Sequence, residues 1–66
     1  MINDKLKQYL SDKGIKHSYI AGKINIPQNI FSYMINGKRK IKPEEFSKIC
    51  DALGVSSEEL RNYKPL

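Results

Sequence analysis

Long hydrophobic runs are missing from this chain, whose apolar residues occur in groups of only a few. A helix needs ~20 apolar residues to cross a membrane, so we expect no membrane span. Residues 1–5 are followed by a polar stretch instead of the apolar one that a secretion signal requires. The single cysteine, Cys50, has no second thiol for an internal disulfide, so nothing favours secretion. We expect a soluble, cytoplasmic protein.

The side chains that enzymes and metal sites use are also scarce. His17 is the only histidine and Cys50 the only cysteine, so the sequence offers no set of ligands for a metal ion. It has no nucleophile paired with a general base and no glycine-rich loop that would cradle a phosphate. We therefore expect no enzyme, no metal ion, no cofactor and no small-molecule substrate. Cys50 is most simply a small core residue.

Acidic residues are absent between residues 13 and 43. Seven bases occur there: Lys13, Lys16, Lys23, Lys38, Arg39, Lys40 and Lys42. The other five bases and all seven acids lie outside, where five minus seven gives a net charge of −2. A field of one sign indicates a polyanionic partner, either nucleic acid or an anionic membrane surface. A membrane surface is disfavoured because no helix joins a basic face to a strong apolar one. A solvated basic face without a partner is the other alternative.

The spacing of apolar residues predicts an all-α fold. A chain of 66 residues forms one domain with a modest core, which removes only ~60% of the unfolded surface from water. Helical periodicity predicts five helices, over residues 3–13, from 16 or 18 to 24, 27–36, 43–53 and 56–62. No strand pattern is present. We expect a compact five-helix domain over residues 1–62 and a short tail over residues 63–66.

Local signals mark the ends of the first three helices. Asn3 can cap the first helix, and Gly14 allows the positive φ that ends it. Asn25 tolerates the left-handed conformation that a sharp turn between helices requires. Pro27 fits the first position of the third helix, because its missing N–H would be unpaired there. Gly37 ends that helix.

Start signals precede the last two helices. Pro43 opens the fourth. Before the fifth, Ser56 and Glu59 form a capping box, and Val55 and Leu60 form a hydrophobic staple around it. The residues expected to face the core recur at helical spacing: Leu6, Tyr9, Leu10, Ile20, Ala21, Ile24, Ile30, Phe31, Met34, Ile35, Phe46, Ile49, Cys50 and Leu53.

Residues 27–37 divide into two faces when they are read as a helix. One face is apolar and contains Ile30, Phe31, Met34 and Ile35. The other carries only uncharged polar side chains: Gln28, Asn29, Ser32, Tyr33 and Asn36. Donors and acceptors without net charge suit the edges of bases in a DNA groove. The alternative is a polar face that touches nothing, but the basic residues around it favour DNA.

Two helices joined by a turn at Asn25-Ile26, the second with an uncharged polar face, have the pattern of a helix-turn-helix. At this point nearly the whole chain resembles the phage repressor and Cro family of bacterial DNA-binding regulators (XRE-type). The matching residues are Gly14, Ile20, Ala21, Ile24, Ile26, Phe31 and Met34, the segment Asn36-Gly37-Lys38-Arg39, and Ala52-Leu53-Gly54-Val55-Ser56 with Leu60. The resemblance implies a repressor-like fold in which the second and third helices form the helix-turn-helix.

The chain departs from this family at three places. Asn25 stands where the family usually has Gly, and a small capping residue is common where Pro27 stands. Some members pair an Arg on the first helix with a Glu at the end of the third, in the positions held here by Leu10 and Ile35. Replacing both ions by apolar groups of similar size can be neutral or stabilising. We therefore expect Leu10 and Ile35 to touch.

The resemblance also implies how DNA is bound. Family members insert the third helix into the major groove and occupy pseudo-palindromic operators as dimers. The implied base readers are Gln28, Asn29, Ser32 and Tyr33, of which the two amides can bond adenine in two places. Tyr33 has the alternative of lying along the sugar-phosphate backbone. The implied phosphate contacts are His17, Ser18, Asn36, Lys38, Arg39 and Lys40. For His17 the alternative is an exposed histidine with no role.

We expect a sequence-specific transcriptional regulator, a small repressor or Cro-like protein, whose partner is a double-stranded DNA operator. Self-association would be weak and reinforced by DNA, with contacts from the loop before the fourth helix and from the fifth. Two alternatives stay open. One is the DNA-binding part of an antitoxin or a larger repressor. The other is a protein-interaction module that uses the third helix to bind an acidic protein.

Overall fold

A computed structural model describes residues 2–65 of the chain. Within that range the protein is all-helical, and its helices are α1 (Ile2–Lys13), α2 (His17–Lys23), α3 (Gln28–Ile35), α4 (Pro43–Leu53) and α5 (Ser57–Arg61). These five helices confirm the predicted all-α fold. Each begins and ends within one residue of its predicted bounds.

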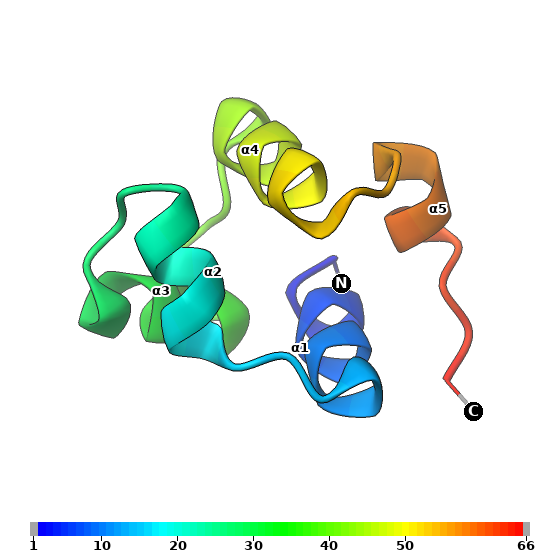
Figure 1. Cartoon of the computed structure of the whole chain (residues 1–66), viewed down its shortest axis with the longest axis horizontal. Coiled ribbons are helices and arrows are strands. Elements are labelled where there is room, and N and C mark those ends of the chain that lie inside the picture. The colour runs from blue at the N-terminus through cyan, green and yellow to red at the C-terminus, as the bar shows by residue number, and fades with distance from the viewer. Residues whose placement is uncertain (1, 66) are drawn as a thin grey trace.

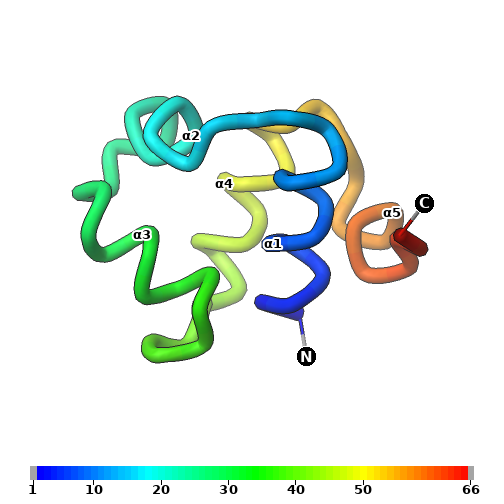
Figure 2. Tube along the Cα trace, turned by 90° about the horizontal axis from the view of Figure 1, so that it is seen from below, coloured from blue at the N-terminus to red at the C-terminus, as the bar shows by residue number. Residues whose placement is uncertain are grey.

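The helices pack into a body of 28 × 22 × 20 Å. Figure 1 shows α2 and α3 together at one end, α1 and α4 in the middle, and α5 at the other end. α1 packs against both α3 and α5, α2 packs against α3 and α4, and α4 packs against α5. The view in Figure 2 places α3 on the outside of the molecule, away from α5. One side of α3 therefore rests on the body and the other faces solvent.

Eleven apolar side chains form a single core to which all five helices contribute. They are Leu6, Leu10, Ile20, Ala21, Phe31, Met34, Ile35, Phe46, Ile49, Cys50 and Leu60. Of the other residues expected to face the core, Tyr9, Ile24, Ile30 and Leu53 are partly buried and pack against it. Within residues 2–65 no polar or charged side chain is buried. The predicted core is confirmed, and the direct contact between Leu10 and Ile35, which share this core, stays a prediction.

Cys50 lies inside this core with only 3% of its surface exposed. Burial raises the pKa of its thiol, and the thiolate is the nucleophilic form of cysteine. The prediction that Cys50 is a small core residue is confirmed.

Two of the predicted helix-start signals are wrong. Asn3 lies within the first turn of α1, because the helix already includes Ile2, whose partly buried side chain packs against the core. Pro27 is the N-cap of α3, with φ −54° and ψ 140°, and precedes the first helical position. The proline ring fixes φ but leaves ψ free. An extended ψ carries the chain out of the preceding turn, and the Pro27 carbonyl accepts the first helical hydrogen bond from the Phe31 N–H at 3.0 Å.

The capping box before α5 is confirmed. The Glu59 N–H donates to Ser56 Oγ at 3.0 Å, and the Ser56 N–H donates to Glu59 Oε1 at 3.4 Å. Two of the N–H groups that a helix start leaves unpaired are thus bonded. The predicted stops at Gly14 and Gly37 are confirmed as well, since both have positive φ, and Gly54 after α4 has the same conformation.

Tyr63, the first residue of the segment expected to form a tail, is bound to α1. Its hydroxyl donates to Asp12 Oδ2 at 2.5 Å, and its carbonyl accepts from Lys5 Nζ at 2.9 Å. Its ring packs edge-on against Tyr9, with the ring centres 5.0 Å apart. Residue 63 is therefore part of the packed body of the domain.

Candidate nucleic-acid interface

The turn between α2 and α3 is fixed by Asn25. Its φ of 57° is the only positive value at a non-glycine residue in the described part of the chain. The Asn25 N–H donates to Gly22 O at 3.4 Å, and the Ile26 N–H donates to Ala21 O at 3.0 Å. This pair of bonds is the Schellman arrangement, which satisfies carbonyls at the end of α2. The prediction of a left-handed Asn25 is confirmed.

Ala21 and Ile26, which are joined by the second of these bonds, set how α3 lies against α2. Ala21 is 2% exposed, and its methyl group leaves room for close approach. The partly buried Ile26 packs against the core. A polar side chain at either position would need a partner in an apolar environment. The sequence therefore fixes both the sharpness of the turn and the face that α3 turns inward.

The two faces of α3 predicted from the sequence are present. Phe31, Met34 and Ile35 are buried, each with at most 1% of its surface exposed, and Ile30 is partly buried. On the opposite face Gln28, Asn29, Tyr33 and Asn36 are exposed and Ser32 is partly exposed. Tyr33 has 47% of its surface exposed. The uncharged polar face is thus turned to solvent.

Gln28 and Asn29 stand in the first turn of α3. Neither side chain forms a hydrogen bond with another group in residues 2–65, and the same holds for the Tyr33 hydroxyl. An exposed amide has free donors and a free acceptor. These three side chains are therefore available to a ligand that approaches α3 from outside.

At the C-terminal end of α3, unlike in its first turn, the polar side chains form hydrogen bonds within the protein. Asn36 Nδ2 donates to Ser32 O at 2.9 Å and lies 3.4 Å from Ser32 Oγ. Asn36 Oδ1 accepts from Lys7 Nζ at 2.8 Å. Lys7 belongs to α1 and lies outside the acid-free segment, so nothing in the sequence indicated it. The two residues are 29 positions apart, and no local pattern in the sequence signals this pair.

The basic loop after α3 begins with a second Schellman arrangement. The Gly37 N–H donates to Met34 O at 3.3 Å, and the Lys38 N–H donates to Tyr33 O at 2.9 Å. Gly37 has a φ of 77°, and a Cβ added there would lie 2.9 Å from Asn3 Nδ2. The positive φ favours glycine at this position, and the Asn3 side chain would have to shift to admit a Cβ. The loop is therefore held in place directly after α3.

Arg39 is the one basic residue of this loop that forms an ion pair with an acidic residue. Its Nη1 and Nη2 donate to Glu45 Oε1 and Oε2, each at 3.1 Å. The Lys42 N–H donates to Glu45 Oε1 at 2.9 Å. The hydrogen bond from Arg39, followed by that from the Lys42 backbone, lowers the pKa of Glu45 from its ordinary value of 4.5. Lys38 and Lys40 are exposed and have no acidic partner within residues 2–65.

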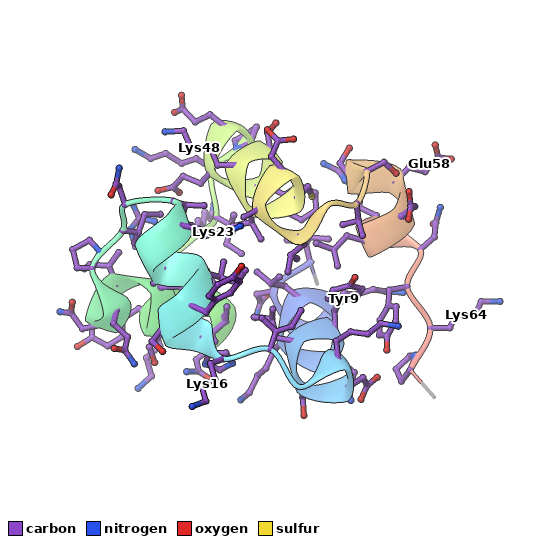
Figure 3. The ribbon with its side chains drawn as sticks, in the orientation of Figure 1. Tyr9, Lys16, Lys23, Lys48, Glu58 and Lys64 are labelled. Carbon is purple, nitrogen blue, oxygen red and sulfur yellow. The ribbon has the colours of Figure 1, made fainter. Side chains whose placement is uncertain are left out.

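The predicted phosphate contacts on α2 lie at its first two residues. His17 is partly buried, and its ring packs against Phe31 with the ring centres 6.1 Å apart. Ser18 is exposed. His17 is thus not a freely exposed side chain, since it helps join α2 to α3. Figure 3 shows Lys16 at the beginning of α2 and Lys64 at the far end of the molecule, so the bases near α2 lie apart from those of the C-terminal segment.

Residues 2–65 hold no group of three or more His, Cys, Asp or Glu side chains that could bind a metal ion. No helix in this range is both long and apolar enough to cross a membrane.

A short helix, a left-handed turn at Asn25 and a second helix with a solvated polar face define a helix-turn-helix domain. The family model for Cro/C1-type HTH DNA-binding domains matches residues 5–65. The chain therefore belongs to this family and is a DNA-binding domain of the kind found in transcription regulators. Members of the family are typically non-enzymatic. Comparisons with curated proteins and with solved structures gave no match.

Proposed function

We propose that this protein is a small repressor or Cro-like regulator that acts in the cytoplasm on a pseudo-palindromic DNA operator. The observation that carries the proposal is the exposed face of α3, where the side chains of Gln28, Asn29 and Tyr33 have no hydrogen-bond partner within residues 2–65. In a DNA-binding family this is the helix that enters the major groove. The protein would read sequence with these side chains.

The base readers would be arranged along α3 from its N-terminus. Gln28 and Asn29 come first, and each amide can bond adenine N6 and N7, which is worth ~1–3 kcal/mol of discrimination. Ser32 and Tyr33 follow one turn later and would reach the next bases. Tyr33 can also lie along the sugar-phosphate backbone, because its side chain is long and 47% of the residue is exposed.

Phosphate contacts would frame α3 on both sides. Lys38 and Lys40 are the exposed cations of the loop, and a lysine ammonium binds phosphate as a point charge. Ser18 and His17 would approach the backbone from the start of α2. Arg39 would contribute less, because Glu45 already pairs with its guanidinium.

We also propose that the protein dimerises weakly and that DNA reinforces the dimer. The surface between α1, α4 and α5 has an open apolar hollow of about 370 Å³, whose walls include Ile2, Ile41 and Phe46. Lys5 and Arg61 lie at the same hollow. A symmetric contact here would bring like charges together, which opposes tight association in the absence of DNA.

The proposal is tested by in vitro selection of duplexes from a random pool. A regulator of this kind should enrich a pseudo-palindrome with half-sites about 10 base pairs apart. Gln28→Ala combined with Asn29→Ala should abolish the enrichment but retain salt-dependent binding to random duplexes. Lys64→Gln, on the far side of the molecule, is the control and should enrich the same sequence.

Two results of this selection would be decisive against the proposal. If no sequence is enriched by the wild-type protein, it does not read operators, and a module that binds an acidic protein explains the basic surface better. If a sequence is enriched equally by the wild-type protein and the double alanine variant, another part of the surface reads DNA. An antitoxin or larger repressor would share the same reading surface and is distinguished by the genes beside the selected site.

A further inference from the structure

Lys7 reaches the C-terminal end of α3 although it belongs to α1. Its Nζ donates to Asn36 Oδ1 at 2.8 Å, and both residues are exposed. α1 packs directly against α3, and in Figure 2 the first turns of α1 lie beside the end of α3. The ammonium group therefore stands on the same side of the domain as the face proposed to read DNA.

The nitrogen and the oxygen of the Asn36 carboxamide both form hydrogen bonds. Its Nδ2 points back to its own helix and donates to Ser32 O at 2.9 Å. Its Oδ1 holds the ammonium group of Lys7. An ammonium group has three donors and no acceptor, so Lys7 keeps two donors after this bond. Lys7 therefore presents two free donors to an anion at this end of α3.

We propose that Lys7 makes the phosphate contact at the C-terminal end of α3 and that Asn36 positions it. The inference rests on the proposed DNA binding and assigns to Lys7 the contact that the family resemblance implied for Asn36. A lysine side chain is flexible, and holding its ammonium group before DNA arrives reduces the entropy lost on binding. The carboxamide supplies this hold without adding a charge that would repel phosphate.

The salt dependence of binding separates the two roles. Each phosphate neutralised by a cation contributes ~0.9 to the slope of log K against log salt, and a neutral side chain contributes nothing to it. Lys7→Gln should weaken binding to all duplexes of about 20 base pairs by roughly three- to tenfold per protomer and reduce the slope by ~0.9. Lys7→Arg should restore the slope. Lys64→Gln removes the same charge far from α3 and should leave the slope unchanged.

A double-mutant cycle tests the positioning role of Asn36. Asn36→Ala should weaken binding by a smaller factor than Lys7→Gln and keep the wild-type slope, because the charge is still present. When Lys7 is already Gln, the change Asn36→Ala should have no further effect. If Asn36 bound phosphate itself, it would cost the same in both backgrounds.

The inference is overturned if Lys7→Gln and Lys64→Gln give the same slope, or if Asn36→Ala costs as much in the Lys7→Gln background as in the wild type. Thermal unfolding of each variant shows whether the fold is kept, and the Lys7→Arg variant repeats the test with the charge retained. If the slope is unchanged but an operator is still selected through Gln28 and Asn29, only this inference fails. If the wild-type protein binds no duplex, the proposed function fails and the inference with it.

Discussion

Arg39 and Glu45 join the loop after α3 to the first turn of α4 through two parallel hydrogen bonds of 3.1 Å each. Glu45 is the more covered partner, with 17% of its side chain exposed against 34% for Arg39. The same carboxylate accepts the Lys42 N–H at 2.9 Å and so caps α4. One acid thus fixes the position of the loop that carries the free cations Lys38 and Lys40.

This ion pair predicts different roles for the adjacent basic residues Lys38 and Arg39. Lys38→Gln should weaken binding to every duplex and reduce the salt slope by ~0.9, because an exposed cation is lost. Arg39→Gln should change the slope less and destabilise the fold more, because it leaves the Glu45 carboxylate without its partner. Duplex titrations at several salt concentrations and urea unfolding of both variants check this. Equal slopes in the two variants would mean that Arg39 binds phosphate as fully as Lys38 does.

The stabilisation from Glu45 should depend on pH. Its pKa is lowered in the folded protein from an ordinary 4.5, so its contribution is complete above about pH 4.5 and is lost as the pH falls through the folded pKa. At neutral pH, Glu45→Gln should reduce the free energy of unfolding by about 1 kcal/mol. Below the folded pKa the variant and the wild type should be equally stable.

Glu44→Gln is the matched control, since Glu44 lies in the same first turn of α4 and is exposed. It removes the same charge from the helix start without breaking a bond to Arg39. Urea unfolding from pH 7 to about pH 3 compares the variants. A difference between wild type and Glu45→Gln that stays constant over this range would contradict the assigned cause.

The contribution of Tyr63 to stability should depend on pH in the opposite direction. Its hydrogen bond to Asp12 is the main reason that its pKa is raised from 10 to about 12. The contribution of Tyr63 is therefore complete below pH 10 and is lost as the pH rises through about 12. Tyr63→Phe should lower the unfolding temperature at neutral pH, and ultraviolet titration of the wild type should show one tyrosine that ionises late.

Tyr19→Phe is the control for this prediction, because Tyr19 is 55% exposed, and Lys23 Nζ lies over its ring at 5.2 Å from the ring centre. The control should keep the unfolding temperature and the late-titrating tyrosine. If Tyr63→Phe also leaves both unchanged, the C-terminal segment is not held by Asp12.

Two glycines should respond oppositely to alanine. Gly22 lies within α2, and no atom is within 4 Å of a Cβ added there. Gly22→Ala should stabilise the fold by about 0.5–1 kcal/mol, because glycine is unfavourable inside a helix. Gly37→Ala should destabilise it by at least ~1 kcal/mol, because φ is 77° and Asn3 is 2.9 Å from the added Cβ. Urea unfolding measures both, and a stable Gly37→Ala would show that the loop can relax.

Much of the fold follows from local rules that the sequence displays. Helical spacing placed Phe31 and Met34 in the core, and Asn25 could be recognised as a turn residue because few side chains tolerate positive φ. The starts of α1 and α3 were misplaced by one residue. Capping preferences tolerate such shifts, since Ile2 joins the core and the ψ of Pro27 stays free.

The pairs that shape the candidate surface could not be predicted. Lys7 meets Asn36 across 29 positions, and Tyr63 meets Asp12 across 51. These hydrogen bonds depend on how whole helices pack. The spacing of polar residues along a sequence does not indicate which distant residue each will contact. Even the ion pair between Arg39 and Glu45, which are close in the sequence, could not be predicted. A run of basic residues does not show which of them will pair with an acidic residue.

The most direct test of sequence reading by α3 is a loss-of-contact measurement at the selected operator. Each base pair is varied in turn, and the affinities of the wild type, Gln28→Ala and Asn29→Ala are compared. We predict that each alanine variant loses discrimination at one base pair, by ~1–3 kcal/mol, while other positions keep their preferences. If both variants retain the full wild-type preference at every base pair, the exposed amides of α3 do not read DNA.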